Sequence, residues 1–544
     1  MKRMRLLLGM LAMAALMAGT VAFLSPYAPV VGPAPQIEAI WAMEDARRES
    51  GTPLITCLEN GGMRLGYDAQ ENTFYCPIGL ENGETWPELH LTAPGAGRAR
   101  LCFADDYAYD WCDEAVREGY AYQILVCTEA QYAYTQVVFT GLPVVCLTTD
   151  AEITLDEQPG FAAISAPGYG PIQADARIGL RGAATLEDPK RAYKVEFAGS
   201  RHGGRMAYDL PGIGMESELA LLPMGTDETM MREKLSWELY AALEGADGPF
   251  GARRTQHVEL FVNDEYVGVY LMMNLMDAQR ELGLAGERHL RDDSVYRSTY
   301  LPTARDRSTI EDPLMGPFEF GYELRYSARP GREFDDLQPY LALLTADDEA
   351  FAAHVPEMMD LDQVLRYDLF VQACGLNDNT YNNMFIRAQR TAQGMRYSLH
   401  PWDLDLSWGT RTDHIGEGYD WWMRFPLVDR ILDLDVGGAR ARLAQLWQQM
   451  RETLFTPEKV ARMMDAYILE LTESGAARRN ELRWEMGMSY PDGQEIMDFA
   501  CTRLAVMDEI VARIAGADGR LPFLMEDCGE SSGIAVFGGQ AGRE

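Results

Sequence analysis

Residues 377–409 read NDNTYNNMFIRAQRTAQGMRYSLHPWDLDLSWG. The run opens with short polar side chains, and two β-like segments follow at 383–388 and 396–400. Gln393-Gly394 lies between these segments and favours a tight turn, so the stretch predicts a β-hairpin. Such a hairpin brings residues 401–405 back beside the polar opening of the stretch.

The polar opening follows a predicted helix over residues 361–374. Asp360 is the expected N-cap of that helix and Gly375 its C-terminal stop. Asp378 then lies in a loop, and Asn383 follows five residues later. A carboxylate in this position is able to orient an attacking hydroxyl, and an amide oxygen is able to hold a metal. The alternative is local turn chemistry, because Asp and Asn often bond their own backbone in loops.

Asp403 and Asp405 close the predicted hairpin. In an extended segment these two carboxylates point the same way, with Leu404 directed into the core between them. They suit hard-oxygen coordination of Mg²⁺ or Mn²⁺, with Asn379 and Asn382 as alternative loop ligands. A structural Asp pair, or a Ca²⁺ site without catalysis, stays open on the residues alone. A carboxylate, an amide, a hairpin and a second carboxylate follow the order by which protein kinases hold a hydroxyl and Mg-ATP.

Basic residues gather around the turn RGAATLEDPKR, which begins at Arg181. Lys190 lies at its end, and Lys194 lies on a predicted strand whose apolar residues alternate to the other face. In kinases a lysine on a strand contacts the phosphates of ATP. A single strand lysine, however, more often simply lies on a solvent-exposed face of the sheet. Arg232 opens a predicted helix over residues 231–242 and is a further candidate for phosphate. The sequence contains no GxGxxG or Walker A motif, which argues against ordinary protein kinases and P-loop enzymes.

The chain has 544 residues, 47% hydrophobic content and a net charge of -35. This acidity argues against nucleic acid and anionic lipid as partners. Residues 1–24 combine a basic start with an uncharged apolar run and predict a signal peptide or an uncleaved membrane anchor. We therefore expect the body to be extracytoplasmic, either anchored to the membrane through this segment only or secreted.

The remaining chain predicts an α+β protein of several parts. Residues 25–50 are expected to be a linker, and short alternating runs within 51–142 suggest a small β-sandwich. Six cysteines fall between residues 57 and 146, as structural disulfides or buried thiols, while Cys374 and Cys501 are expected to face a helical core. Residues 281–318 resemble an irregular insertion, and 516–544 a flexible tail. Further predictions are a hairpin at 257–262 and 266–272, paired strands at 176–180 and 192–197, and helices over most of 440–514.

Segments throughout residues 143–515 resemble the CotH kinase family of atypical protein kinases. The resemblance rests on LPVVCLTTD, RIGLRGAATLEDPKRAYKVEF, LLPMGTDETMMREKLSWELY, VELFVNDEYVGVYLM, GYELRY, LNDNTYNN and HPWDLDLSWG, which occur in this order. It implies an atypical protein-kinase-like fold, with a mixed sheet lobe and a helical lobe. It also implies use of ATP and a divalent metal to phosphorylate Ser or Thr of proteins.

By the resemblance, Asp378 matches the catalytic-loop aspartate, Asp403 the metal-binding aspartate with Asp405 beside it, and Asn383 the second-metal amide. Lys190 and Lys194 fall in the family's basic strand, and which of them contacts the nucleotide stays open. Two departures stand out: the usual RGxSS turn is RGAAT here, and Asn274 replaces a frequent Glu. A catalytically inactive surface module, such as an adhesin or coat-assembly factor, is the alternative function. A carbohydrate-active enzyme is less well supported, since the acidic pair suits a metal better than a sugar.

Overall fold

The computed structural model describes residues 28–29, 37–80, 89–97, 99–104, 112–182, 186, 188–199, 204–225, 227–244, 253–276, 293–298, 318–319, 321–327, 329, 331–410, 419, 421–484, 492–521 and 534–536. The chain divides into two compact units. Unit 1 comprises Met1–Glu228, Thr255–Asn274 and Tyr467–Pro491, and unit 2 comprises Thr229–Arg254, Leu275–Ala466 and Asp492–Glu544. The boundary expected between residues 142 and 143 falls inside unit 1 and stays a prediction.

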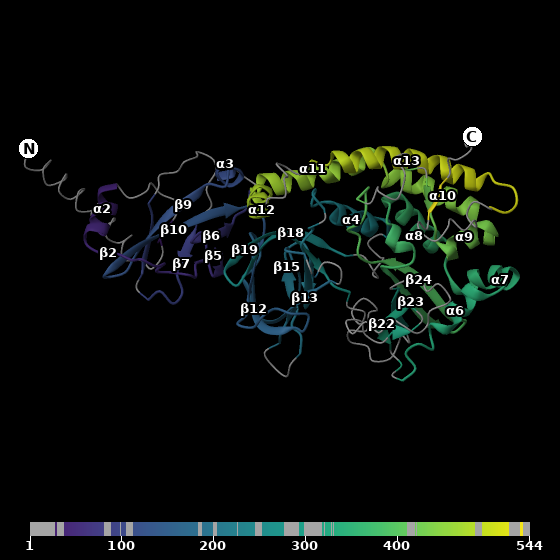
Figure 1. Cartoon of the computed structure of the whole chain (residues 1–544), viewed down its shortest axis with the longest axis horizontal. Helices are drawn as coiled ribbons and strands as arrows, with labels where there is room; N and C mark the ends of the chain where they lie inside the picture. The colour runs from purple at the N-terminus through teal and green to yellow at the C-terminus, as the bar shows by residue number, and fades with distance from the viewer. Residues whose placement is uncertain are drawn as a thin grey trace, which may run out of the picture. The chain divides into compact units, whose positions relative to one another are not determined.

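Seven described strands of unit 1 close into a barrel, drawn in blue and teal in Figure 1. Their order is β11 (Val144–Thr148), β12 (Gln158–Ser165), β13 (Ile172–Arg181), β14 (Ala192–Phe197), β17 (Glu218–Leu222), β19 (Glu265–Asn274) and β18 (Thr255–Val262). β11 and β18 close the barrel in parallel, and the other neighbours are antiparallel. Alternate side chains fill its interior, among them Tyr193, Val195 and Phe197 of β14. The predicted alternation along β14 is therefore confirmed.

The N-terminal part of unit 1 contains two further sheets over a shared apolar core. One sheet orders β1 (Ala28–Pro29), β7 (His90–Thr92), β3 (Glu59–Asn60) and β4 (Met63–Arg64). The other orders β5 (Gly66–Asp68), β6 (Thr73–Pro77), β10 (Gln131–Thr140), β9 (Ala121–Cys127) and β8 (Arg100–Phe103), with β2 (Arg48–Glu49) on β10. Leu91 and Phe139 are among the side chains of that core. Helices α2 (Ile37–Asp45) and α3 (Cys112–Arg117) accompany these sheets. The hairpin of β15 (Tyr208–Leu210) and β16 (Gly214–Glu216) also belongs to unit 1.

A late part of the chain returns to the barrel of unit 1. It comprises the end of α11 (Pro457–Glu473) and helix α12 (Ala476–Trp484), which packs on β19. Arg479 forms a bidentate ion pair with Glu259 of β18, at 2.7 and 3.0 Å, and both side chains are buried. His257 Nδ1 lies 2.8 Å from Glu470 Oε2. Buried polar contacts therefore join residues more than 200 positions apart.

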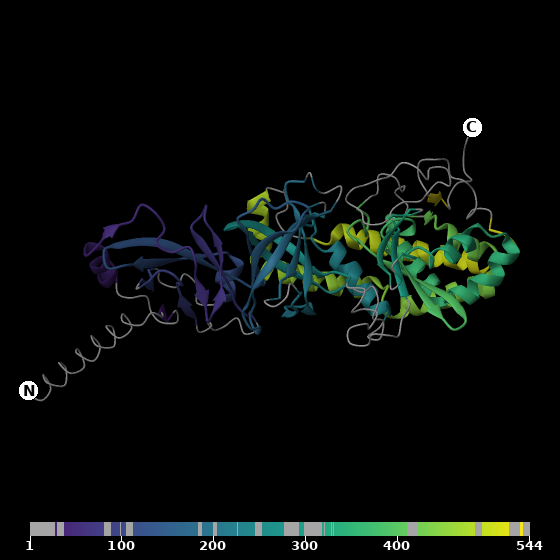
Figure 2. The same ribbon diagram turned by 90° about the horizontal axis from the view of Figure 1, so that it is seen from below.

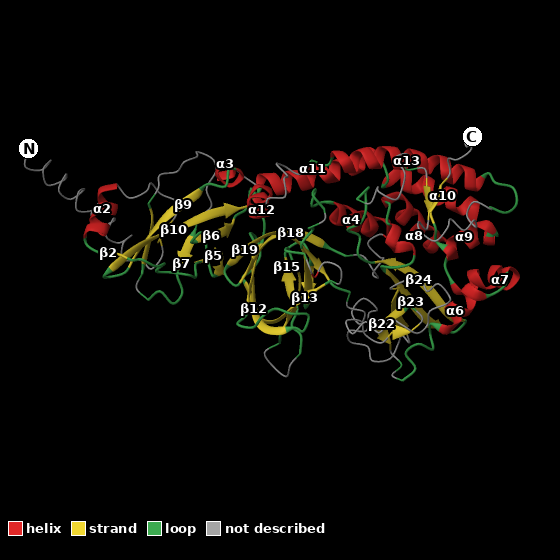
Figure 3. Ribbon diagram, viewed as in Figure 1, coloured by secondary structure: helices red, strands yellow, loops and turns green. Residues whose placement is uncertain are grey.

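Unit 2 is built on a five-stranded antiparallel sheet. Its order is β21 (Phe318–Glu319), β22 (Tyr322–Ser327), β20 (Asp293–Ser298), β23 (Met384–Thr391) and β24 (Gly394–Pro401). Helices α7 and α8 pack against β24, as Figure 3 shows, and α10 packs on α8 and α13. Figure 2 gives a second view of this sheet and its helices.

The helical elements of unit 2 account for most of its remaining described residues. They are α4 (Arg232–Glu244), α6 (Gln338–Thr345), α7 (Asp348–Met358), α8 (Leu361–Cys374), η2 (Asn377–Thr380), α9 (Pro426–Asp433), η3 (Val436–Gly438), α10 (Ala439–Thr453), the first part of α11, and α13 (Gln494–Ala515). A short pair of strands, β25 (Trp421–Met423) and β26 (Ile534–Val536), is also present.

Most predicted elements are confirmed. The β18–β19 hairpin turns at Asn263 and Asp264, whose φ values of 50° and 61° suit a tight turn. Two predictions are wrong. Residues 293–298 are strand β20 inside the sheet rather than part of an irregular insertion, and Cys501 is exposed on α13 rather than core-facing.

Cys374 is buried as predicted, and the eight described cysteines are free thiols. The segment 1–24, Ala183–Thr185 of the RGAAT turn and most of the predicted tail lie outside the described residues. Within the described part of the chain, no helix is both long and apolar enough to cross a membrane.

Candidate active site

Helix α8 leads into the polar loop of residues 377–383, which ends where strand β23 of the unit 2 sheet begins. Asp360 caps its N-terminus by accepting hydrogen bonds from the backbone of Asp362 and Gln363, as predicted. Gly375 ends the helix with φ 73°, the left-handed conformation that glycine adopts without strain. A Cβ atom at this position would lie only 2.9 Å from Cζ of Phe499, so both conformation and space require glycine.

Asp378 lies in the short helix η2, immediately after this turn. Its carboxyl is partly exposed, and the Tyr381 hydroxyl donates to Oδ1 over 3.3 Å. The backbone carbonyl of Asp378 accepts from Asn382 N over 2.7 Å. The loop therefore has an ordered backbone and presents the Asp378 carboxylate at its surface.

The buried amide of Asn379 joins this loop to the segment after the hairpin. Its Nδ2 donates to the backbone oxygens of Asn383 and Trp402, over 2.8 Å each. Trp402 N in turn donates to Asn383 O over 2.8 Å. The hairpin of β23 and β24 thus returns residues 401–405 beside the loop, as the sequence predicts.

The backbone is left-handed at two candidate ligands, Asn383 with φ 46° and Asp403 with φ 59°. Asn and Asp are the side chains that tolerate this conformation best. Leu404 is fully buried as predicted, while Asp403 is exposed and Asp405 is half-buried. The prediction of an extended segment is wrong at Asp403, because its φ of 59° is left-handed and not extended.

A residue that the sequence did not single out lies near Asp403. Arg297 of β20 pairs with Glu323 of β22 over 2.9 Å, and the charge of Asp403 also acts on its guanidinium. Burial lowers the pKa of Arg297, and the two acidic neighbours oppose this shift. In the segment DSVYRS, residues 293–298, only the Val-Tyr pair favours a strand, and the polar residues on both sides of it weaken that signal.

Helix α4 supports the same segment from another side. Trp408 Nε1 donates to Ser236 Oγ over 2.9 Å, and Ser236 Oγ lies 3.0 Å from Ser407 Oγ. Arg232, a predicted phosphate contact, is buried and pairs with Glu495 of α13 over 3.0 Å. Its phosphate role stays a prediction.

The other predicted phosphate contacts belong to unit 1. Lys190 is 5% exposed, and its Nζ donates to Val269 O over 2.6 Å and to Asn480 Oδ1 over 3.0 Å. Burial lowers the pKa of Lys190 to about 7. Lys194 is partly exposed and meets Glu157 at 2.7 Å and Glu218 at 3.6 Å. Arg181 ends β13 opposite Ala192, and it is partly exposed.

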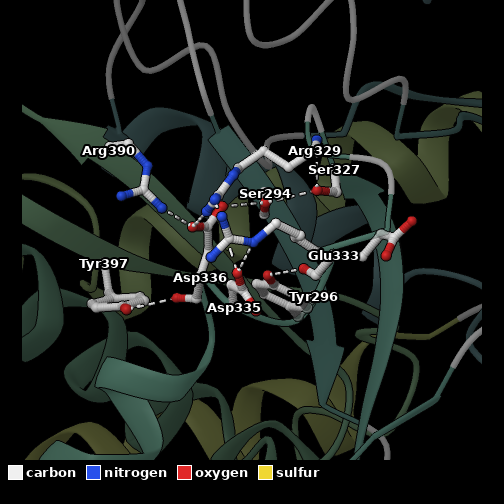
Figure 4. A network of polar contacts seen from close by, with 10 residues as sticks. Ser294, Tyr296, Ser327, Arg329, Glu333, Asp335, Asp336, Arg390 and Tyr397 are labelled. Carbon is white, nitrogen blue, oxygen red and sulfur yellow. Dashed lines mark hydrogen bonds and ion pairs between the residues drawn. The ribbon is translucent and has the colours of Figure 1, made fainter.

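A polar network centred on the buried Asp336 fixes the opposite end of the unit 2 sheet (Figure 4). Ser294 of β20 donates to its Oδ2 over 2.9 Å, and Arg329 donates to its Oδ1 over 3.0 Å. Arg390 of β23 also pairs with this carboxylate, and the Tyr397 hydroxyl of β24 donates to the Asp336 carbonyl over 2.7 Å. Three strands are thereby held in register through one residue.

The donor atoms around the loop suit a hard cation. Among the described residues, no three His, Cys, Asp or Glu side chains form a metal cluster. Mg²⁺ needs only one or two protein carboxylates, because it keeps water and takes phosphate oxygens. Asn379 Oδ1 is a buried acceptor without a hydrogen bond in the described part of the chain. The Nδ2 of the same amide donates to the carbonyl of Trp402, the residue before Asp403. The residues present therefore fit a divalent cation by donor chemistry.

Family comparison assigns the chain to a class. The model described as CotH kinase protein matches residues 178–507, which is more than half of the sequence and includes every predicted site residue. The chain therefore belongs to the CotH kinase protein family. Comparison with curated proteins gave no match.

Proposed function

We propose that this protein is an atypical, ATP-dependent Ser/Thr protein kinase. The observation that carries the proposal is the amide clamp of Asn379, which joins the Asp378 loop to the Asp403 segment. In this proposal the Asp378 carboxylate accepts the hydrogen bond of an acceptor hydroxyl and orients its oxygen. The hydroxyl proton passes to the Asp378 carboxylate, a new bond forms between the hydroxyl oxygen and the γ-phosphorus of ATP, the bond from that phosphorus to the β-phosphate oxygen breaks, and ADP leaves.

Asn383, Asp403 and Asp405 are the proposed ligands of Mg²⁺ or Mn²⁺. When bound, the metal supplies positive charge against the phosphate oxygens. The left-handed backbone at Asn383 and Asp403 supports this role, since such conformations concentrate at functional sites. Arg297, which pairs with Glu323, places a positive charge near Asp403.

We assign the phosphate-contacting role in unit 1 to Lys194 rather than Lys190. The Lys190 amine is enclosed by two protein acceptors and lies over the Tyr270 ring, 4.9 Å from its centroid. The Lys194 amine is partly exposed beside the carboxylates of Glu157 and Glu218, so a phosphate group could reach it more easily than the enclosed Lys190 amine. Arg181 and Arg232 are proposed as weaker contributors of positive charge.

The wider setting is also proposed from the sequence. Residues 51–142 would be a β-sandwich-like accessory domain, and 143–515 a kinase-like domain with a sheet lobe and a helical lobe. The apolar segment 1–24 would place the body outside the cytoplasm. The acceptors would be cell-surface or coat proteins, and nucleic acid would not be a partner.

Metal-dependent nucleotide binding together with label transfer tests the proposal. Wild type, Asp403→Asn and Lys194→Met are titrated with ATP, with and without Mg²⁺ or Mn²⁺, and incubated with γ-labelled ATP and generic Ser/Thr acceptors. We expect Asp403→Asn to lose the metal dependence and Lys194→Met to weaken ATP binding by about tenfold. Binding without transfer by the wild type would instead favour the inactive surface module.

A further inference from the structure

Unit 2 has a pocket with mainly apolar walls, which include five aromatic side chains, beside the candidate catalytic loop. Its volume is about 250 Å³. A cavity of about 150 Å³ is sufficient to hold benzene, so this pocket has room for a large side chain. The aromatic residues that line it come from five elements or loops, and they are Tyr322, Tyr340, Phe351, Tyr381 and Phe425.

The pocket lies at the sheet edge that carries the candidate metal ligands. Ser298 of β20 pairs in register with both Tyr322 of β22 and Met384 of β23, and all three residues line the pocket. Asn383 immediately precedes Met384, and Met384 pairs with Pro401 at the open end of the hairpin, away from its turn. The pocket and the candidate ligands are therefore neighbours along the same strand ends.

Tyr381 connects the pocket directly to the candidate catalytic carboxylate. It lines the pocket, and its hydroxyl donates to Asp378 Oδ1 over 3.3 Å. Ser298 Oγ donates to the Tyr381 carbonyl and holds this residue on the sheet. A peptide chain advances at most about 3.6 Å per residue, so a side chain in the pocket belongs a few residues from a hydroxyl at Asp378.

The charged residues in the pocket wall determine which kind of ligand side chain the pocket can accept. Arg424 pairs with the buried Asp429 over 3.1 Å, and burial raises the pKa of that carboxyl. Arg430 lies over the Phe351 ring, 4.3 Å from its centroid, and pairs with Asp348. The chain's own arginines thus occupy the positions that a basic side chain would need. Apolar walls with two guanidinium groups favour an aromatic side chain, whose ring packs on the walls.

We propose that this pocket binds an aromatic side chain, Phe or Tyr, of the acceptor protein, a few residues from the Ser or Thr that receives phosphate. This inference rests on the proposed kinase function. It adds that an aromatic residue near the phosphorylated Ser or Thr helps to decide which proteins are substrates. The pocket would act in binding, so it would change KM more than kcat.

Peptide libraries test the preference in the full-length protein. Each peptide carries one central Ser, and each flanking position in turn is fixed as Phe, Tyr, Leu, Ala, Asp or Arg. We expect Phe or Tyr at one position to raise kcat/KM by about tenfold or more over Ala, mainly through KM, with Arg the poorest residue. Equal rates for Phe, Ala and Arg at every position would overturn the proposal.

A pocket-filling variant separates this site from the rest of the surface. Leu344 of α6 lines the pocket and is partly exposed, so Leu344→Trp would fill the space without replacing a buried core residue. Ala342→Trp, at an exposed position of the same helix, is the matched control. Leu344→Trp should abolish the advantage of Phe over Ala and leave the Ala peptide unchanged, whereas Ala342→Trp should alter neither.

A photo-crosslinking arm does not depend on phosphoryl transfer. Benzoylphenylalanine replaces each flanking residue in turn, and mass spectrometry identifies the crosslinked sites. Crosslinks to segments containing Tyr322, Tyr340 or Phe351 that Leu344→Trp suppresses would support the pocket, even if no peptide receives phosphate and the kinase proposal falls. Crosslinks elsewhere, or crosslinks that Leu344→Trp leaves unchanged, would contradict it.

Discussion

Two residues at the candidate site, Asn383 and Asp403, hold backbone angles that side chains other than glycine rarely adopt. They flank the hairpin, one before β23 and one after β24. Asn379 Nδ2 donates to the carbonyl of Asn383 and to that of Trp402, the residue before Asp403. The position of the Asp403 carboxylate therefore depends on a buried amide that would not itself touch the acceptor.

Replacing that amide should loosen the site. We expect Asn379→Ala to lower the free energy of unfolding by about 1–3 kcal/mol, because two buried carbonyls lose a donor. We also expect phosphoryl transfer to slow by about tenfold to a hundredfold, since the loop and the Asp403 segment lose their direct link. Denaturant titration measures the first effect and label transfer the second.

Gln393→Ala in the exposed turn at the far end of the hairpin is the matched control, and it should change neither quantity. If Asn379→Ala kept wild-type transfer while losing stability, the amide would be structural only.

Lys190 predicts a pH dependence of stability. Burial lowers its pKa from 10.5 to about 7, so between these values the unfolded chain binds a proton that the folded chain has released. Stability then rises with pH across this window, by at most about 1.4 kcal/mol for each pH unit. The unfolding free energy of wild type minus that of Lys190→Met should therefore increase from pH 7 to pH 10, as measured by denaturant titration. A constant difference would show that Lys190 keeps its proton in the folded state.

The sequence predicted which residues form the candidate site better than it predicted the backbone conformation and burial of each one. The positions of Asp378, Asn383 and Asp403 around one hairpin followed from spacing and turn chemistry. The turn at Asp403 did not, because a left-handed residue inside an apparently extended segment leaves no periodic signal. Cys501 was predicted to face the helical core, but it is exposed on α13.

At the scale of elements, the barrel of unit 1 depends on helices that arrive late in the chain. Arg479 of α12 pairs with Glu259 of β18, and the Tyr266 hydroxyl donates to the same carboxylate over 2.9 Å. Glu259 is fully buried, so loss of Arg479 would leave its charge without a cationic partner among the described residues. Local sequence patterns could not predict this ion pair, because its two residues are 220 positions apart.

We expect Arg479→Ala to destabilise unit 1 by about 3–5 kcal/mol, as removal of one partner of a buried ion pair does. Arg478→Ala on the same helix should cost less than about 1 kcal/mol, because Arg478 is an exposed residue. Hydrogen exchange of the β18 and β19 amides, followed by mass spectrometry, measures both effects locally. Equal protection in the two variants would mean that the ion pair does not anchor α12.

Strand β20 shows where element prediction failed. Its six residues lie between segments outside the described part of the chain, and polar side chains surround its Val-Tyr pair. Pairing with β22 and β23, rather than its own pattern, makes it a strand. The strand is important because it supplies Arg297 near Asp403 and Ser298 at the pocket.

At the scale of the whole molecule, the family match over residues 178–507 draws on both units. Unit 1 contributes the barrel with Lys190 and Lys194, and unit 2 contributes the hairpin with Asp378, Asn383 and Asp403. The α+β class and most elements could be predicted from local patterns. The closed barrel could not, because it requires the pairing of β11 with β18, far apart in the sequence.

The most direct test of the kinase proposal is to measure phosphoryl transfer and ATP affinity on the same samples of wild type and Asp378→Asn. We predict that wild type transfers the γ-phosphate to a Ser/Thr acceptor in the presence of Mg²⁺ or Mn²⁺. Asp378→Asn should bind ATP with nearly unchanged affinity and transfer phosphate at least about a hundredfold more slowly. Equal transfer by the two proteins, or no transfer by wild type that binds ATP with metal, would contradict the assignment.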